Sequence, residues 1–450
     1  MLGLRICFLF VFGTVPFLKS LATVEVESSI SSDSVVTRHM RERGLNVADG
    51  NDVCFYDNGH DKFVDLFSEI RKARSFVHLE YFNFRNDSIA NLLFGLLAQK
   101  VREGVEVRAL YDDFGNSSNN KPIKSAMHDS ICGLGINLVL FDPIRFPWVN
   151  HIIPRDHRKI VVIDGRVAFT GGMNVADYYI DGIKEVGEWH DLHMRIEGPA
   201  VDDLHHIFTT IWEKVTGEAV SGVRYFPRSY GVDFYENGEL LDKDEKRVGE
   251  EWNMNPNFYL GLHQRVEEKA RLVIVDRSPG VRADAIRDLY VTMLDAAQKS
   301  VKLINPYFVP THAVRKALKR AVDRGIDVQI LLSAKSDIPM TPETTHYVGN
   351  NLMKRGARVF LFEGGFHHTK MMIVDDAFCT VGSSNLDARS LRCDYEVNTL
   401  ILSKPHALQL VGLFENQKQK AVEIQKGYWR SRSLWKQFVG WFGNLLTPVL

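Results

Sequence analysis

Apolar and polar positions follow one pattern twice along this chain. Residues 69–82 are typical of a helix end, a turn and a buried strand, and residues 293–308 repeat that order. Amphipathic segments follow at 92–102 and at 314–324, where apolar side chains recur at helical spacing. The pattern therefore predicts the same arrangement of helices and strands in each half of the chain.

Glycines at matched positions mark the same repeat. Gly104 and Gly325 follow the two amphipathic segments, where glycine typically ends a helix, and each opens an alternating strand. Gly135 and Gly356 open a further strand pair, and each glycine pair is 221 residues apart. This order predicts an α/β fold of two pseudo-symmetric halves, each a mixed, largely parallel sheet flanked by helices. Packing about a pseudo-twofold axis would give the halves a shared cleft.

The pattern divides the 450 residues into five parts. Residues 50–214 and 272–425 form the two halves, and residues 215–271, richer in charge, glycine and turn residues, form a linker or insertion. Residues 1–22 hold an apolar run shorter than the roughly 20 residues that cross a bilayer. This run predicts a signal peptide or an N-terminal membrane anchor. Residues 426–450 are expected to form a C-terminal amphipathic helix.

Composition adds constraints of its own. The formal net charge is −1 and the hydrophobic content is 45%, so the chain has no general attraction for nucleic acid. Its five cysteines are scattered without a C-x-x-C pair, which favours free thiols over a zinc site. We therefore expect no metal, no cofactor and no nucleic-acid partner.

The strongest chemical signal is a motif that occurs once in each half. His-x-Lys-x4-Asp begins at His157 and again at His368, and each copy is followed by a small-residue turn that ends in asparagine. The motif residues are His157, Lys159, Asp164 and Asn174 in the first half, and His368, Lys370, Asp375, Ser383 and Asn385 in the second. Two matched copies predict one site made jointly by both halves.

These residue types suit phosphodiester exchange without a metal. Histidine and lysine two positions apart on a strand point to the same face. One unprotonated histidine can attack phosphorus and form a phosphohistidine, while the opposite histidine protonates the leaving alkoxide. Charge on the pentacoordinate intermediate would be neutralised by Lys159, Lys370, Asn174, Asn385 and Ser383.

The carboxylates receive separate roles. Asp164 and Asp375 are part of the catalytic motif, but Asp164-Gly165 is a hairpin-turn pair, which favours anchoring over proton transfer. Each histidine also needs a carboxylate on its other ring nitrogen to fix the tautomer. Asp191 and Glu396 lie downstream at similar distances and are the candidates.

These motifs resemble those of the phospholipase D superfamily, and more narrowly those of bacterial cardiolipin synthases. The resemblance covers residues 52–450 and includes the stretches 189–199 and 305–310. It implies two pseudo-symmetric phospholipase D-like halves with a shared active-site cleft. It also implies that two phosphatidylglycerol molecules give cardiolipin and glycerol through a phosphatidyl-histidine. The resemblance makes His157 the nucleophile and His368 the acid, whereas the symmetry of the sequence leaves their order open.

The C-terminal segment independently indicates a lipid partner. Apolar residues from Leu434 to Leu446 form a helical stripe rich in aromatic side chains, and lysine and arginine residues lie in it and just ahead of it. This composition is typical of an interfacial helix on an anionic membrane surface, and the alternative is a helix packed on the protein core. We expect association with a bacterial cell membrane, and the sequence leaves its sidedness and the oligomeric state open.

Two other activities use the same motif. A hydrolytic phospholipase D would use water as the acceptor, and acceptor choice depends on water exclusion, which no motif reports. A phosphodiester nuclease is disfavoured because the basic and aromatic residues cluster at a terminus rather than around the motifs. Phosphatidyl transfer is the leading hypothesis.

Overall fold

The computed structural model describes residues 31–145, 153–231, 235–236, 239–240 and 266–446. Ser32–Leu450 form one compact unit. The expected signal peptide or anchor at 1–22, residues 241–265 of the linker and the last four residues lie outside the described ranges. The five-part division of the chain therefore stays a prediction.

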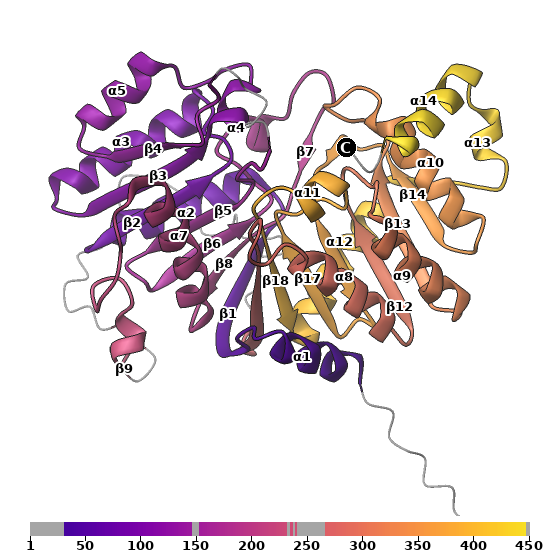
Figure 1. The fold of residues 1–450 in the computed structure, drawn as a ribbon, viewed down its shortest axis with the longest axis horizontal. Helices are drawn as coiled ribbons and strands as arrows, with labels where there is room; N and C mark the ends of the chain where they lie inside the picture. The colour runs from indigo at the N-terminus through magenta and orange to yellow at the C-terminus, as the bar shows by residue number, and fades with distance from the viewer. Residues whose placement is uncertain (1–30, 146–152, 232–234, 237–238, 241–265, 447–450) are drawn as a thin grey trace, which may run out of the picture. The chain divides into compact units, whose positions relative to one another are not determined.

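One 15-stranded sheet runs through both halves (Figure 1). The first half contributes β1 (Ala48–Tyr56), β2 (Phe76–Tyr81), β3 (Glu106–Asp112), β4 (Asn137–Phe141), β5 (Lys159–Ile163), β6 (Val167–Gly171) and β8 (His193–Glu197). The second contributes β11 (Ala270–Arg277), β12 (Ser300–Ile304), β13 (Asp327–Ser333), β14 (Arg358–Phe362), β16 (Met371–Val374), β17 (Phe378–Gly382), β18 (Glu396–Leu402) and β19 (Ala421–Glu423). The order is β19-β14-β13-β12-β16-β17-β18-β11-β1-β8-β6-β5-β2-β3-β4. Outward from β1, the order repeats the order outward from β11, except that β19 is added at the outer edge of the second half. The repeated order confirms the two related halves.

The mixed α/β architecture is confirmed, but the expectation of largely parallel sheets was wrong. Parallel pairing within the large sheet joins only β2 to β3 to β4, and β12 to β13 to β14. The strands that carry the motifs return through tight hairpins, and a hairpin can connect only antiparallel neighbours. The remaining pairs, including β11 with β1, are antiparallel.

Helices cover both faces of the sheet. They are α1 (Ser32–Glu42), α2 (Gly59–Lys72), α3 (Ser88–Arg102), α4 (Asp113–Ser117), α5 (Ser125–Gly133), α6 (Tyr178–Asp181), α7 (Ala200–Thr216), α8 (Ala285–Ala296), α9 (His312–Asp323), α10 (Thr341–Met353), α11 (Ala388–Arg392), α12 (Lys404–Lys418), α13 (Tyr428–Ser431) and α14 (Leu434–Leu445). The predicted helices at 92–102 and 314–324 correspond to α3 and α9. Within the described ranges, no helix is both long and apolar enough to cross a membrane.

Three large apolar clusters and a smaller one around Phe208 and Trp212 make the core. One lies under α2, α3 and α5 of the first half, and another lies under α8, α9 and α10 of the second half and under α1, which precedes the first half in the chain. The third packs α7 and α12 against inward-facing residues of strands from both halves. Because alternate residues of each strand point to opposite faces of the sheet, each half has an apolar cluster on either face. The cluster on one face belongs to that half alone, and the cluster on the other face is shared by both halves.

Asn51 stabilises the junction where the halves meet. Its side-chain amide is fully buried and donates to the carbonyl oxygens of Ala48 (2.8 Å) and Ala270 (3.4 Å). Its oxygen accepts the Ala200 backbone N–H at 2.9 Å, at the start of α7. The register of β1 on β11 shifts at this point, and the amide supplies hydrogen bonds there.

The motif aspartates occupy the hairpin turns, as the sequence predicts. Asp164 and Gly165 have φ values of 54° and 65°, and Asp375 and Asp376 have values of 55° and 53°, the sign that a type I′ turn requires. The Asp164 carboxylate accepts the backbone N–H groups of residues 74, 75 and 76, each at 2.8 Å. Asp375 accepts the N–H groups of residues 298, 299 and 300 in the same way. Each aspartate therefore joins a motif hairpin to the start of the neighbouring strand.

Replacing Asp164 should destabilise the protein. We expect Asp164→Ala to lower the free energy of unfolding by about 3 kcal/mol, because three N–H groups lose their acceptor and alanine must adopt a positive φ. Asp164→Asn, which tolerates that φ and keeps one acceptor oxygen, should lose about 1 kcal/mol. Urea unfolding monitored by circular dichroism measures both changes. Equal midpoints for Asp164→Ala and the unchanged protein would contradict the anchoring role.

Candidate active site

The two motif histidines lie just before their strands, and each is held by backbone of the opposite half. The His157 N–H donates to the Tyr395 carbonyl at 2.9 Å, and residues 156 and 395 form a parallel bridge. The His368 N–H donates to the His190 carbonyl at 2.6 Å. That contact continues a parallel pair between β7 (Trp189–His190) and β15 (Phe366–His367). At both histidines, therefore, the backbone of one half hydrogen-bonds to the backbone of the other half.

Each histidine is paired with a carboxylate of the other half. Nδ1 of His157 lies 3.1 Å from both Glu396 oxygens. Nδ1 of His368 lies 2.7 Å from Oδ2 of Asp191. The sequence identifies both carboxylates as candidates but does not predict that they pair with the histidine of the other half. Each carboxylate follows the histidine and the small-residue turn of its own half in the same order, so the sequence offers no sign of a crossed pairing. Neither half therefore contains both a catalytic histidine and the carboxylate that pairs with it.

The motif lysines lie against the same histidines. Nζ of Lys159 donates to the His157 carbonyl at 2.6 Å, and Nζ of Lys370 donates to the His368 carbonyl at 2.5 Å. Nζ of Lys370 also lies 2.8 Å from Nδ1 and 3.2 Å from Nε2 of His368. Both ammonium groups are buried. The structure thus gathers two histidines, two cations and two carboxylates in one place.

The small-residue turns make room for this cluster. A Cβ on Gly172 would lie 2.1 Å from the Asp191 carboxylate, so only glycine lets that side chain approach. A Cβ on Gly382 would lie 2.3 Å from the Asn398 side chain, and a Cβ on its counterpart Gly171 would lie 2.7 Å from the His193 backbone. The glycines therefore accommodate the neighbouring strand, a role beyond the phosphate approach expected from sequence.

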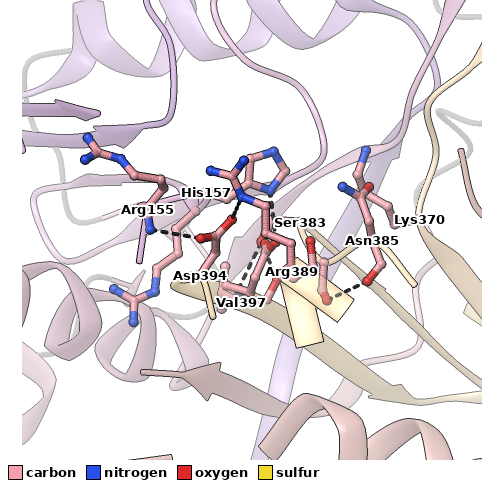
Figure 2. A network of polar contacts seen from close by, with 12 residues as sticks. Arg155, His157, Lys370, Ser383, Asn385, Arg389, Asp394 and Val397 are labelled. Atoms are coloured by element: carbon pink, nitrogen blue, oxygen red, sulfur yellow. Dashed lines mark hydrogen bonds and ion pairs between the residues drawn. The ribbon is translucent and has the colours of Figure 1, made fainter. Parts of the chain in front are cut away.

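Ser383 supports a carboxylate, while each of the two asparagines leaves its buried side-chain oxygen unpaired among the described residues. The Ser383 hydroxyl is fully buried and donates to Glu396, and it also accepts the Val397 N–H at 3.0 Å (Figure 2). This arrangement replaces the expected direct role of Ser383 in charge neutralisation, because its proton is already engaged. The side-chain oxygens of Asn174 and Asn385 are buried, and within the described part of the chain they have no hydrogen-bond partner.

Burial governs the protonation of the cluster. It lowers the pKa of His157 to about 4, although Glu396 acts in the opposite direction. It also lowers the pKa of His368, where the Lys370 ammonium adds to the effect and Asp191 opposes it. Burial lowers the pKa of Lys159 to about 7. Both rings are therefore neutral at pH 7, and the Nδ1–H bond to a carboxylate leaves the lone pair on Nε2.

Two motif residues lie away from this chemistry. Asp164 and Asp375 bind backbone at the far end of their strands, roughly 20 Å from the histidine seven residues earlier. Grouping them with the catalytic residues was therefore wrong, and their anchoring role is the one observed. Arg158 also points away from the site and donates to Glu80 and Asp276.

Sequence reasoning missed the aromatic surroundings of the histidines. The ring of Phe82 lies 4.9 Å from that of His157, measured between centroids. The rings of Trp189, Phe366 and Tyr307 lie 5.5, 5.6 and 6.0 Å from that of His368. Trp189 and Tyr307 belong to stretches that the sequence analysis singled out, but nothing in their spacing indicates this contact. Across the described ranges, no group of three or more histidine, cysteine or acidic side chains could hold a metal ion.

Comparisons with known proteins agree on a family. The family model described as "Cardiolipin synthase, PLD-like domain" matches residues 66–212 and 290–418. The chain is 31% identical over 417 residues to "Probable cardiolipin synthase YwiE" of Bacillus subtilis, covering 92% of this chain and 75% of that protein. It is 31% identical over 403 residues to a cardiolipin synthase of Staphylococcus aureus, covering 89% of this chain and 74% of that protein.

Solved structures share the fold at lower identity. A phosphatidylserine synthase of Haemophilus influenzae superposes with a TM-score of 0.64 at 15% identity, covering 92% of this chain and 100% of that chain. A polyphosphate kinase of Porphyromonas gingivalis superposes with a TM-score of 0.51 at 12% identity, covering 84% of this chain and 49% of that chain. These likenesses concern the fold alone.

The crossed pairs predict a large loss of turnover when either carboxylate is neutralised. Glu396→Gln and Asp191→Asn should each lower kcat on the order of 10³-fold, because an amide no longer fixes the tautomer of the opposite histidine. Initial rates with a chromogenic phosphodiester measure this loss, and Glu213→Gln, an exposed change on α7, is the matched control. Folded variants with wild-type kcat would contradict the pairing as a functional feature.

Proposed function

The chain belongs to the family of cardiolipin synthases with a phospholipase D-like domain, which are phosphatidyltransferases acting on phospholipids, and on this premise we propose its reaction. It converts two phosphatidylglycerol molecules into cardiolipin and glycerol. The observation that carries the proposal is the pair of crossed histidine–carboxylate contacts at one site.

The first half of the reaction is transfer to His157. Nε2 of neutral His157 attacks phosphorus of the first phosphatidylglycerol, so a P–N bond forms while the P–O bond to the headgroup glycerol breaks. Protonated His368 gives its proton to the departing glycerol oxygen, which leaves as neutral glycerol. Glu396 stabilises the charge that develops on the His157 ring.

The second half reverses this sequence with a new alcohol. A primary hydroxyl of the second phosphatidylglycerol gives its proton to His368, and its oxygen attacks phosphorus. The P–N bond then breaks, His157 is restored and cardiolipin is released. Lys159, Lys370 and the side chains of Asn174 and Asn385 balance the charge on each pentacoordinate intermediate.

The protonation states support this division of roles. A pKa of about 4 leaves His157 unprotonated and ready to attack. His368 has a lowered pKa in the free protein, yet it must carry a proton when the substrate is bound. An anionic phosphodiester beside the ring favours the charged form, and Asp191 acts in the same direction. The negative charge of the bound substrate thus raises the pKa of His368, so that the ring can carry the proton it donates.

The product distinguishes this proposal from hydrolysis. Purified protein incubated with phosphatidylglycerol vesicles should form cardiolipin and glycerol, resolved by thin-layer chromatography, and EDTA should leave the rate unchanged because the chemistry uses histidines. His157→Ala should lower turnover by at least about 10⁴-fold through loss of the nucleophile. Phosphatidic acid without cardiolipin would instead support a hydrolytic phospholipase D.

We also propose that α14 holds the protein on a bacterial membrane surface. Leu434 is 83% exposed and Trp435 is 70% exposed, and five further large apolar residues on and just after the helix are exposed. These are Phe438, Trp441, Phe442, Leu445 and Leu446. Exposed basic residues that would attract anionic lipid are Lys426, Arg430 and Lys436.

The inner side of α14 explains why this stripe points outward. A Cβ on Gly443 would lie 2.1 Å from Oγ1 of Thr344, and a Cβ on Gly440 would lie 2.6 Å from the Glu343 carbonyl, so α14 packs on α10 through its glycines. Arg432 adds a two-pronged ion pair with Glu343 at 2.7 and 3.0 Å. The helix therefore packs on the protein through its glycines and leaves the large apolar residues named above exposed to solvent, which supports the interfacial role proposed for it.

Removing two aromatic residues should weaken membrane binding. Trp435→Ser combined with Phe438→Ser should lower affinity for phosphatidylglycerol vesicles by at least about tenfold, because two large apolar side chains no longer enter the lipid interface. Vesicle co-sedimentation measures the affinity, and Leu408→Ser, an exposed apolar residue on α12, is the control. Equal sedimentation of the double variant and the control would contradict the role of α14.

A further inference from the structure

The two catalytic histidines lie in unlike surroundings. His157 contacts the single ring of Phe82, whereas Trp189, Phe366 and Tyr307 surround His368. Trp189 and Phe366 also contact each other, with centroids 4.7 Å apart. The aromatic wall therefore belongs to one side of a site that is otherwise built by symmetry.

Tyr307 connects this wall to a carboxylate at the surface. Its hydroxyl donates to Oδ1 of Asp337 at 2.6 Å, and the Ser336 hydroxyl donates to the same oxygen at 3.2 Å. Asp337 lies in the loop between β13 and α10 and is exposed, so a ligand can reach it from solvent. It is also close enough to raise the pKa of both His368 and Lys370, against the larger effect of burial.

The corresponding place in the first half is closed. Phe76 and Ser300 begin matching strands, because the carbonyl oxygen of each accepts the N–H of a motif aspartate. Seven residues after each of them stand Asn83 and Tyr307, which are therefore counterparts. The spacing of 221 residues between β3 and β13 makes Asn116 the counterpart of Asp337. Asn116 is buried in α4, where its amide exchanges hydrogen bonds with Ile123 at 2.8 and 3.0 Å. Among the residues that the structure describes, the counterpart of Asp337 is therefore closed to solvent, whereas Asp337 itself is exposed.

The direction of the chemistry determines what should bind there. When His157 attacks phosphorus, the leaving alcohol departs on the opposite side, which is the side of His368. The incoming alcohol then attacks from the place that the leaving alcohol has vacated. One alcohol subsite therefore serves both halves of the reaction, and in the proposed reaction both alcohols are glycerol units.

We propose that Asp337, held by Tyr307, is the specificity determinant of this alcohol subsite and binds the glycerol unit of the substrate. Its carboxylate accepts a hydrogen bond from the hydroxyl adjacent to the reacting oxygen, while the partly exposed ring of Trp189, backed by the buried ring of Phe366, packs against the glycerol carbons. This inference rests on the proposed phosphatidyl transfer and adds to it a preference for acceptors with two neighbouring hydroxyl groups.

Competition between two small alcohols tests the subsite. Wild-type protein with phosphatidylglycerol vesicles and equal concentrations of 1,2-propanediol and 1-propanol should form the diol product in excess by about tenfold or more, the expected effect of one hydrogen bond to a charged group. Asp337→Ala should reduce that excess to less than about threefold. Tyr307→Phe, which keeps the ring beside His368 and releases Asp337, should give an intermediate ratio.

The controls separate this inference from the proposed function. Asp323→Ala removes an exposed carboxylate on α9 and should keep the wild-type product ratio. An Asp337→Ala protein that transfers to 1-propanol and keeps the diol preference would overturn the subsite alone, as would a wild-type protein without that preference. Failure of the wild-type protein to transfer to any alcohol would overturn the proposed function, and the subsite with it.

Discussion

The rest of the structure depends on the hydrogen bond between each catalytic histidine and a carboxylate of the opposite half. These bonds span 3.1 Å for His157 with Glu396 and 2.7 Å for His368 with Asp191. Such distances tolerate little displacement, so the halves must be held in one relative position. The parallel backbone contacts at both histidines, the continuous sheet across β1 and β11, and the core shared beneath α7 and α12 all serve this requirement.

The motif combines chemistry at one end of a strand with anchoring at the other. Its histidine and lysine face the site, while its aspartate accepts three N–H groups of the neighbouring strand. The strand between them is fully buried in both halves. Because the aspartate fixes the hairpin and the hairpin fixes the strand, the position of the histidine depends on contacts roughly 20 Å away.

Symmetry alone would give two equivalent histidines, whereas the proposed reaction needs a nucleophile and an acid. The structure departs from symmetry where the two differ in role. The loop after β3 is closed by α4, while the loop after β13 presents Asp337 beside Tyr307. The loop after β13 leads into α10, and α14 packs against α10. The aromatic residues of α14 are exposed. The features proposed to bind alcohol and lipid thus belong to the same half.

The sequence by itself determined the repeat, the helices at 92–102 and 314–324, the paired motif and the hairpin at Asp164, because local periodicity and turn chemistry are properties of neighbouring residues. It also identified Asp191 and Glu396 as candidate partners. Only the tertiary structure decided that these partners cross between halves, that Ser383 supports Glu396, and that most strand pairs are antiparallel. The crossed partners are 239 and 177 residues apart, and even Ser383 and Glu396, 13 residues apart, meet only because β17 pairs with β18. One half-chain carries no local signal that distinguishes its own carboxylate from that of its pseudo-symmetric counterpart.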